Sequence, residues 1–176
     1  MRRSYPAAML RLRPLRPDDE AAVRAAHAAM AADGFTFGLR LEDGTTWDEY
    51  LRILADHRAG LNLPGRHVPS TLLVAEVDGQ VVGRVSIRHQ LNDFLLAEGG
   101  HVGYCVLPAF RRLGHATEML RQALVIARSL GIDRVLVTCD DDNPGSIAVI
   151  EASGGKLDST RPARPGSPAH RRYWID

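Results

Sequence analysis

The chain has 176 residues, of which 22 are Lys or Arg and 21 are Asp or Glu, so its formal net charge is only +1. This length predicts a single domain over residues 1–176, and such a domain buries roughly 70% of the surface of its unfolded chain. The near-neutral charge provides no general field for nucleic acid, and no apolar run approaches the ~20 residues of a membrane span. The N-terminus also lacks the apolar segment of a signal peptide, so we expect a soluble, cytoplasmic protein without a nucleic-acid or membrane partner.

The first half of the chain predicts a strand, two helices and a β-hairpin. Met9–Arg13 alternates apolar and charged residues, as a strand with one solvated face does. Pro17 followed by acidic residues is typical of a helix start, and Thr46 opens a sequence that resembles a capping box. Asp78-Gly79 between two β-prone runs is a strong hairpin signal. The expected spans are 9–13, 17–34, 46–60, 71–77 and 80–89.

The second half predicts alternating strands and helices. An apolar strand ends at Pro108, and a short helix is opened by Asn143-Pro144 and closed by Gly154-Gly155. The expected spans are strands at 99–107, 134–139, 156–159 and 170–175 and a helix at 117–130. Because strands 99–107 and 134–139 are joined through a helix, we expect a right-handed parallel crossover.

Two cysteines, Cys105 and Cys139, each stand inside an apolar segment and lack C-x-x-C spacing. We therefore expect reduced thiols that lie in the core or line a site, in a reducing compartment. The acidic run Asp140–Asp142 lacks the spaced oxygen ligands and glycine turn of a hard-cation loop, so no metal site is predicted. Two interpretations of this run stay open: a solvated turn near a helix start, or an acidic rim that attracts a cationic amine.

The stretch P-A-F-R-R-L-G-H-A-T lies between the apolar strand and the best-defined helix. At such a helix start, unpaired backbone N–H groups and the helix dipole favour an anion, by ~0.3 to 1 kcal/mol for each exposed charge. Gly114 allows close approach and an unusual dihedral, Ala116 keeps bulk away, and an arginine adds positive charge. The stretch is neither a Walker loop nor a dinucleotide fingerprint. A plain turn with surface arginines is an equal alternative from this motif alone.

Two motifs resemble those of the GNAT N-acetyltransferase superfamily. Arg111-x-x-Gly114-x-Ala116 is similar to its acetyl-CoA signature [QR]-x-x-G-x-[GA], and the helix from Asn143 to Gly154 is similar to its second helical motif. The order of elements agrees over almost the whole chain. The resemblance implies an α/β (α+β) fold with a mixed, mostly antiparallel central sheet. Its fourth and fifth strands would form a splayed parallel pair, and helices would flank both faces.

The resemblance also implies acetyl-CoA as the co-substrate. Backbone amides of residues 113–117 would cradle its pyrophosphate, and the fourth strand would pair its edge with the pantetheine amides. Asn143 and Ser146 would contact the pantetheine arm or order the nearby loop, while capping of the helix is an equally weighted role. The expected cofactor-binding residues are Cys105, Val106, Leu107, Arg111, Arg112, Leu113, Gly114, His115, Ala116, Thr117, Asn143 and Ser146.

Acetyl transfer to a lysine-like amine needs the neutral amine, which costs about 4 to 5 kcal/mol at pH 7, so a general base is useful. The family often places a glutamate on the fourth strand, where this chain has His101. With an ordinary pKa of ~6.5, His101 could accept the proton directly or through water. A lone histidine on a strand is as readily structural, and Glu98 is the reserve candidate.

Proton donation to the leaving thiolate is often the task of a tyrosine in the helix after the fifth strand of this family. Ile150 occupies that position here. Tyr173 or Tyr104 could replace it, and the thiolate's pKa of ~8.5 also makes water an adequate donor. Cys105 is expected to line the site, because direct transfer requires no acetyl-cysteine.

These features together predict an acetyl-CoA-dependent N-acetyltransferase, whose acceptor is the primary amine of a small molecule or a peptide. The acceptor would attack the thioester directly. The missing helix tyrosine supports an alternative, a catalytically weak acyl-CoA-binding or sensing module of the same fold. A closing strand can pair across a two-fold axis, so a homodimer is also among the expected states.

Overall fold

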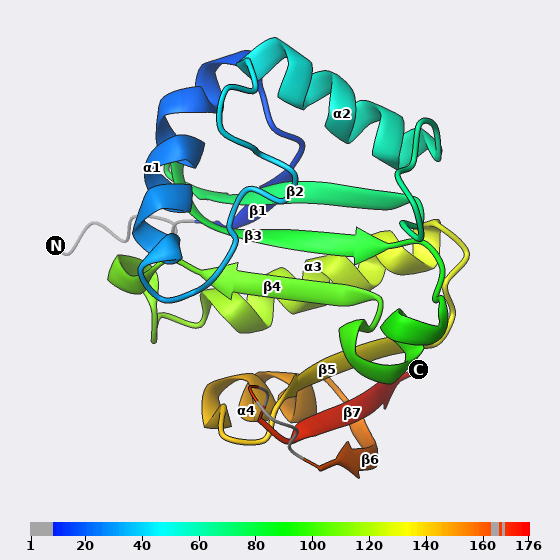
Figure 1. Cartoon of the computed structure of the whole chain (residues 1–176). Coiled ribbons are helices and arrows are strands. Elements are labelled where there is room, and N and C mark those ends of the chain that lie inside the picture. The colour runs from blue at the N-terminus through cyan, green and yellow to red at the C-terminus, as the bar shows by residue number, and fades with distance from the viewer. Residues whose placement is uncertain (1–8, 163–165, 167) are drawn as a thin grey trace, which may run out of the picture.

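The computed structural model describes residues 9–162, 166 and 168–176. Within them, strands form a seven-stranded sheet in the order β1-β2-β3-β4-β5-β7-β6 (Figure 1). The β4–β5 pair is parallel and all the other neighbours are antiparallel, which confirms the predicted mixed sheet. The strands are β1 (Arg11–Arg13), β2 (Ser70–Val77), β3 (Gln80–Arg88), β4 (Val102–Val106), β5 (Val135–Asp140), β6 (Lys156–Arg161) and β7 (His170–Ile175).

Helices cover both faces of the sheet, as expected from the resemblance. Helices α1 and α2 lie over one face and α3 crosses the other, with α4 beside it against β5 (Figure 1). The helices are α1 (Glu20–Ala31), α2 (Trp47–Ala59), α3 (His115–Ser129) and α4 (Pro144–Ala152). In the part of the chain that the structure describes, no helix combines the length and apolar character that a bilayer crossing needs.

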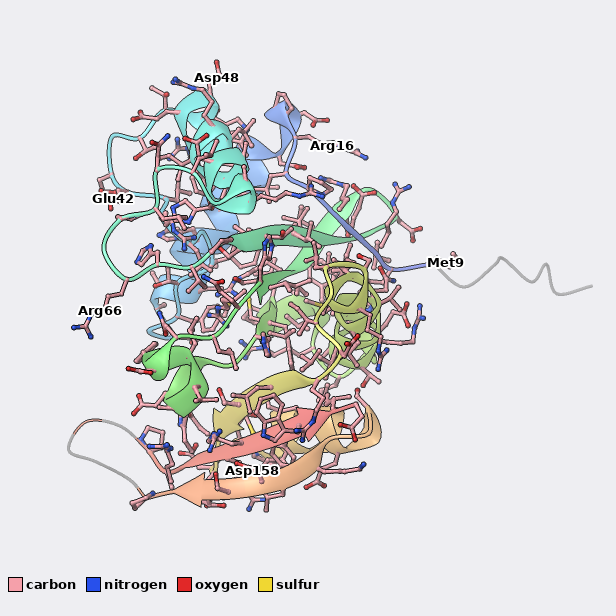
Figure 2. All side chains as sticks on the ribbon, turned by 90° about the vertical axis from the view of Figure 1, so that its right-hand side faces the viewer. Met9, Arg16, Glu42, Asp48, Arg66 and Asp158 are labelled. Carbon is pink, nitrogen blue, oxygen red and sulfur yellow. The ribbon has the colours of Figure 1, made fainter. Side chains whose placement is uncertain are left out.

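Each face of the sheet has its own apolar core, and side chains fill the space between the helices and the strands (Figure 2). Under α1 and α2 the buried cluster includes Phe37, Trp47, Tyr50 and Cys105. Under α3 the cluster includes Leu120 and the alternating inward residues of β3, β4 and β5. Burying a large apolar side chain contributes about 1.5–3 kcal/mol, so the two cores hold the helices against the sheet.

Local sequence signals explain several element boundaries. Thr46 accepts a hydrogen bond from the Glu49 amide and caps α2, which Gly60 ends in a left-handed conformation with φ 74°. Asp78 and Gly79 have φ 48° and 78°, as a tight hairpin turn between β2 and β3 requires. The N-cap at Thr46 and the hairpin predicted from sequence are thus confirmed, whereas the described contacts contain only one of the two hydrogen bonds of a capping box, from the Glu49 amide to Thr46.

Most elements differ from their predicted spans by a few residues at an end, and two of these differences bear on the site. The strand expected at residues 99–107 begins only at Val102, because a π-helical turn at Leu95–Gly99 and Gly100 with φ 64° precede it. Helix α3 begins at His115 rather than at residue 117, because Gly114 with φ 80° already occupies the N-cap position. The first correction leaves His101 outside the regular strand.

Strands β4 and β5 share only the register pair Val102 with Val137. On its other edge β4 pairs with β3 along its whole length, from Val106 opposite Gly83 to Val102 opposite Ile87. The backbone of β4 beyond Val102 therefore has an open edge toward β5. This splay supplies the unpaired strand edge that the resemblance implies.

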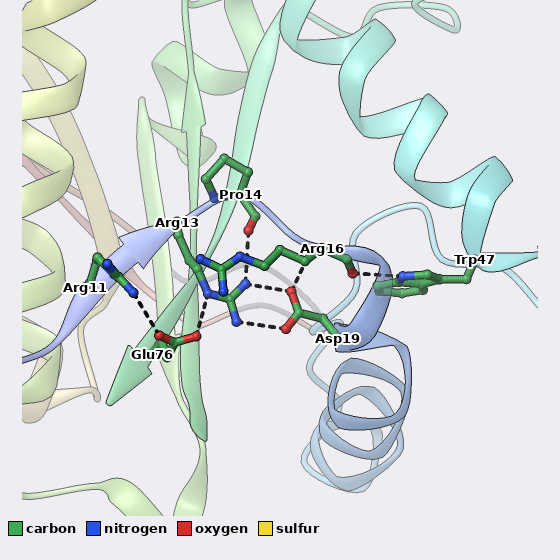
Figure 3. Close-up of polar contacts among 7 residues, drawn as sticks. All are labelled: Arg11, Arg13, Pro14, Arg16, Asp19, Trp47 and Glu76. Atoms are coloured by element: carbon green, nitrogen blue, oxygen red, sulfur yellow. Dashed lines mark hydrogen bonds and ion pairs between the residues drawn. The ribbon is translucent and has the colours of Figure 1, made fainter. Parts of the chain in front are cut away.

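An ion-pair network fixes the start of α1 to the sheet (Figure 3). Arg13 on β1 donates two hydrogen bonds to the Asp19 carboxylate, at 2.6 and 2.8 Å, and one to Glu76 of β2 at 2.6 Å. Asp19 also accepts the Arg16 amide at 2.7 Å, and the Trp47 indole donates to the Arg16 carbonyl at 3.0 Å. The network therefore ties the start of α1 to β1 and β2, and through Arg16 it also holds Trp47 at the start of α2.

Candidate functional site

A cleft of about 760 Å³ lies at the open edge of β4, between the start of α3, the start of α4 and the end of α1. This volume is typical of small-molecule and cofactor sites. Its lining residues are Met30, Asp33, Phe35, Tyr104, Cys105, Val106, Phe110, Arg111, Arg112, Gly114, His115, Ala116, Thr117, Asn143, Pro144, Gly145, Ser146, Ala148 and Val149. Most predicted cofactor residues meet there; Leu107 and Leu113 do not belong to the lining.

The start of α3 presents bare amide groups to this cleft. The first hydrogen bond at the helix start runs from the Glu118 amide to the Gly114 carbonyl, at 3.3 Å. No described residue accepts a hydrogen bond from the backbone amides of residues 112–117. Arg112 and Gly114 are both left-handed, with φ 65° and 80°. Left-handed residues of this kind turn successive amides to one side, and such a concavity binds anions.

Arg111 spans the mouth of the cleft. Its Nε donates to the Val106 carbonyl at 3.2 Å, and its Nη2 lies 3.5 Å from Asp33 Oδ2, beyond the end of α1. Both partners of this ion pair are about half exposed, and such pairs contribute little to stability. Arg111 can therefore give up Asp33 for a phosphate at small cost.

Asn143 and Ser146 line the cleft from the start of α4. Asn143 Oδ1 accepts the Ser146 amide at 3.0 Å, so Asn143 caps the helix. The capping role predicted from the Asn-Pro sequence is thus confirmed, and contact with a pantetheine arm stays a prediction.

Tyr104 lines the cleft, and its buried hydroxyl forms no hydrogen bond of normal geometry with a described residue, although the Ser146 side chain lies near enough to affect it. Burial raises the pKa of Tyr104 to about 12, and the nearby Ser146 side chain only partly opposes this. The hydroxyl is therefore protonated at neutral pH. Buried donors are nearly always used, so an unused donor inside a cleft points toward a ligand.

His101, the first candidate base, is bound to β5. Its Nδ1 accepts the Leu136 amide at 2.9 Å, and its own amide donates to the Leu136 carbonyl at 2.7 Å. A neutral imidazole whose Nδ1 accepts carries its proton on Nε2, so no free lone pair remains. Burial, and then the charge of Arg88, lower the pKa of His101. Catalysis by His101 stays a prediction, and its contacts favour the structural alternative.

Glu98 and Tyr173, the other catalytic candidates, lie outside the cleft lining. The Glu98 carbonyl accepts the Thr138 hydroxyl at 2.6 Å, at the closed end of the splay. Tyr173 is fully buried, and its hydroxyl donates to Glu151 at 3.1 Å. Both roles stay predictions; of the two tyrosines considered as proton donors, the structure brings Tyr104 to the cleft.

Neither thiol is activated. Cys105 lines the cleft, but burial raises its pKa, and burial raises the pKa of Cys139 to about 11. The reactive form of cysteine is the thiolate, so neither residue is a ready nucleophile at neutral pH.

The acidic run begins at Asp140, the last residue of β5. Asp141 forms an ion pair with Arg171, and Asp140 Oδ1 lies 2.8 Å from His170 Nδ1. The pairing of Asp141 favours the solvated turn over an acidic rim for the acceptor. The described ranges contain no group of three or more His, Cys, Asp or Glu residues that could hold a metal ion.

The end of α1 and the loop after it form one side of the cleft, through Met30, Asp33 and Phe35. The sequence F-T-F-G-L-R-L-E-D-G predicts a mobile or substrate-facing loop here, and its Phe35 does line the cleft. Met30 and Asp33 were not predicted, because nothing in their local pattern separates them from ordinary helix-end residues.

The model of the family described as "Acetyltransferase (GNAT) domain" matches residues 9–156. A search of curated proteins found no match. Among solved structures, Mycobacterium smegmatis RimJ in complex with CoA-disulfide is 24% identical, with a TM-score of 0.68 over 97% of this chain and 83% of that one.

Two further structures show the same fold. The putative acetyltransferase yncA of Salmonella typhimurium with acetyl-CoA is 17% identical, with a TM-score of 0.65 over 95% and 93% of the two chains. A spermidine N-acetyltransferase SpeG chimera from Vibrio cholerae and hSSAT is 17% identical, with a TM-score of 0.63 over 94% of each chain. Of these three names only the spermidine N-acetyltransferase states an acceptor, and likeness at this level of identity shows the fold and does not select an acceptor for this chain.

Proposed function

The chain belongs to the GNAT acetyltransferase family, and we propose that it transfers the acetyl group of acetyl-CoA to the primary amine of a small acceptor. The observation that carries this proposal is the cleft in which the bare amides at the start of α3 meet the open edge of β4. The amides suit a pyrophosphate, and the strand edge suits the amides of a pantetheine arm.

The direction of the bound donor follows from the positions of these two parts. The phosphate cradle follows the C-terminal end of β4, so a pantetheine arm would run from Val106 back toward Gly103. Its thioester would then reach the point near Val102 where β4 and β5 separate. Leu107 and Arg112 would border the arm and the cradle.

In the transfer step, the neutral amine forms the N–C bond as the C–S bond breaks, and the sulfur receives a proton. We assign this proton to the Tyr104 hydroxyl, which is protonated and forms no hydrogen bond of normal geometry with a described residue. Glu98 is retained as the candidate base for the acceptor amine. With unactivated thiols at Cys105 and Cys139, direct attack is the simpler route.

The direct test combines acetyl-CoA with a panel of primary amines and measures released thiol. Turnover with at least one amine is expected. Binding of CoA without thiol release across the panel would instead support the acyl-CoA-binding alternative, for which the residue Ile150 in place of a tyrosine is the motivation.

Gly114→Ala tests the cradle. A side chain at φ 80° costs about 1–2 kcal/mol of strain, so the loop should lose its shape and CoA should bind at least about 10-fold more weakly by calorimetry. Gly44→Ala is the matched control, because Gly44 has φ 83° and equally open surroundings. If both variants bind CoA equally well, the amides at α3 are not the cradle.

Tyr104→Phe tests the proton donor. A fall in kcat of about 100-fold is expected, with the KM for acetyl-CoA nearly unchanged, because general acids typically supply 10²–10⁴-fold. Tyr173→Phe is the comparison variant and should leave kcat within a factor of a few if Tyr173 is structural. The opposite order of effects would return the role to Tyr173.

The cytoplasmic location, the single domain and the homodimer stay predictions.

A further inference from the structure

Three arginines lie together on the α1 and α2 side of the sheet. Arg84 and Arg88 belong to β3, and Arg40 lies in the segment between α1 and α2. Arg84 pairs in register with Cys105 of β4, and opposite residues of an antiparallel pair share a face. The arginines therefore lie on the same face as the Cys105 side chain, beside the reactive end proposed for the donor.

Two of these arginines, Arg84 and Arg88, are held by carbonyl groups. Arg84 donates to the carbonyls of Phe37 and Thr36, at 3.1 and 2.9 Å, and its guanidinium lies 4.8 Å from the Phe35 ring centre. Arg88 Nη1 donates to the Gly99 carbonyl at 3.1 Å. Among the described residues, no carboxylate forms an ion pair with Arg40, Arg84 or Arg88.

Positive charge is therefore left uncompensated here. Burial, and then the charges of Arg84 and Arg40, lower the pKa of Arg88 to about 10, which still leaves it protonated at neutral pH. The buried Nε of Arg40 has no hydrogen-bond partner in the part of the chain that the structure describes. Burial of charge without a counter-charge is costly, and a bound anion would reduce this cost.

Arg88 differs from Arg84 in being available. Arg84 is buried, and its Nε and Nη2 donate to carbonyls of the segment after α1, which fixes that segment to β3. Arg88 is half-buried, and the only hydrogen bond from its guanidinium to a described residue goes to Gly99. A guanidinium has five N–H groups, so several remain for a ligand.

Gly103 places Arg88 beside the reaction. A Cβ at Gly103 would lie 3.2 Å from Arg88 Nη1, so the absent side chain leaves space for the guanidinium. Gly103 directly follows Val102, the last residue of β4 that pairs with β5. The thioester would approach this point along β4, and two residues of a strand span only about 7 Å. An anion bound at Arg88 would thus lie close enough to an attacking amine for both groups to belong to one small molecule.

We propose that the acceptor carries a carboxylate close to its primary amine, as an amino acid does, and that Arg88, with Arg40 beside it, binds this carboxylate. This inference rests on the proposed acetyltransferase function and adds the acceptor class. Arg84 is a positioning residue, since it holds the segment that carries Phe35 and Phe37. The cationic surroundings disfavour a polyamine acceptor, because like charges would meet at the site.

The kinetic test compares each of the twenty common L-amino acids with its α-amide, with acetyl-CoA saturating. At least one acid should be acetylated with a kcat/KM about 10- to 100-fold above that of its amide, which corresponds to one charge-assisted contact. Arg88→Gln should raise the KM for the acid by a similar factor, leave the amide and acetyl-CoA unaffected, and be partly rescued by Arg88→Lys. Arg52→Gln, on the exposed side of α2, is the matched control.

Equal use of acid and amide, or preference for amines without an anion, would overturn the proposal. So would an equal loss for both substrate types in Arg88→Gln. A second measurement needs no turnover: thermal unfolding of the CoA-saturated protein in sodium acetate and in sodium chloride of equal ionic strength. Acetate should raise the Tm of the wild type by about 2 °C or more and that of Arg88→Gln by less.

An equal acetate response in the two proteins would also overturn the carboxylate site. Failure of the proposed function gives a different result, namely thiol release from no amine at all. In that case the acetate comparison alone decides whether Arg88 binds a carboxylate.

Discussion

Two sets of buried arginines lie on the sheet of this protein and are treated oppositely. Arg13 is only 7% exposed and is fully engaged by the carboxylates of Asp19 and Glu76. Arg84 is also buried and Arg88 is half-buried, yet the hydrogen bonds that their guanidinium groups make to described residues go only to carbonyl oxygens. An arginine that is paired with carboxylates of the same chain stabilises the fold. An arginine without such a partner can bind an anionic ligand.

The first difference to test is the cost of losing a partner. Asp19→Asn removes the counter-charge of Arg13 and should lower the free energy of unfolding by about 3–5 kcal/mol, the usual result of breaking a buried pair. Urea denaturation near neutral pH measures it. Glu20→Gln, which removes the exposed ion pair with Arg24, is the control and should change stability by less than about 1 kcal/mol. Similar losses in both variants would mean that the buried Arg13 network stabilises the fold no more than an exposed ion pair does.

The second difference is the pH range in which stability is lost. Hydrogen bonds from Arg13 lower the pKa of Asp19 below its ordinary 3.8, so this stability is present above pH 3.8 and is lost as pH falls through the lowered value. Burial, and then the charge of Arg40, lower the pKa of His57 from 6.5 to about 4. Its folded state binds fewer protons, so stability is lost as pH falls from 6.5 to about 4.

Denaturation across pH 3 to 8 separates these contributions. His57→Phe should flatten the curve between pH 6.5 and 4, and Asp19→Asn should flatten it below about pH 4. If His57→Phe leaves the slope between pH 6.5 and 4 intact, burial and the charge of Arg40 do not lower the pKa of His57.

The smallest expected effect is on stability in Arg88→Gln. Its guanidinium has no acid partner among the described residues and is repelled by Arg84 and Arg40. The unfolding free energy should therefore change by no more than about 0.5 kcal/mol, or rise slightly, as for substitutions outside packed networks. Thermal and urea unfolding without ligand measure it. A loss above about 2 kcal/mol would show that Arg88 is as structural as Arg13.

The cleft that we propose for the donor could be predicted from sequence, because its features are set by local backbone geometry. Gly114 and the Asn143-Pro144 pair specify a left-handed N-cap and a capped helix with short, local rules. Such rules need no knowledge of which distant segments meet. For the same reason the hairpin at Asp78-Gly79 was predicted to the residue.

The arginine-bearing face of β3, where we propose that the acceptor binds, could not be predicted in this way. Arg84, Ser86 and Arg88 alternate with apolar residues along β3, which is the pattern of a strand with one solvated face. Burial of that face depends on α1 and α2, far away in sequence. Whether a carboxylate reaches an arginine is likewise decided by tertiary packing. His101 was placed in the strand because its pattern alternates, whereas the left-handed Gly100 delays the strand by three residues relative to the predicted start at 99.

The single register pair between Val102 and Val137 also has a mechanical consequence. It makes the seam between β4 and β5 the weakest line of the sheet, with β1 to β4 on one side and β5, β7 and β6 on the other (Figure 1). A molecule lying in the gap touches both halves, since the cleft is lined by Val106 from one and Asn143 from the other. Such a molecule acts as a clamp across the seam. Binding of a substrate should therefore slow hydrogen exchange of the amides along β5, far from the reacting atoms.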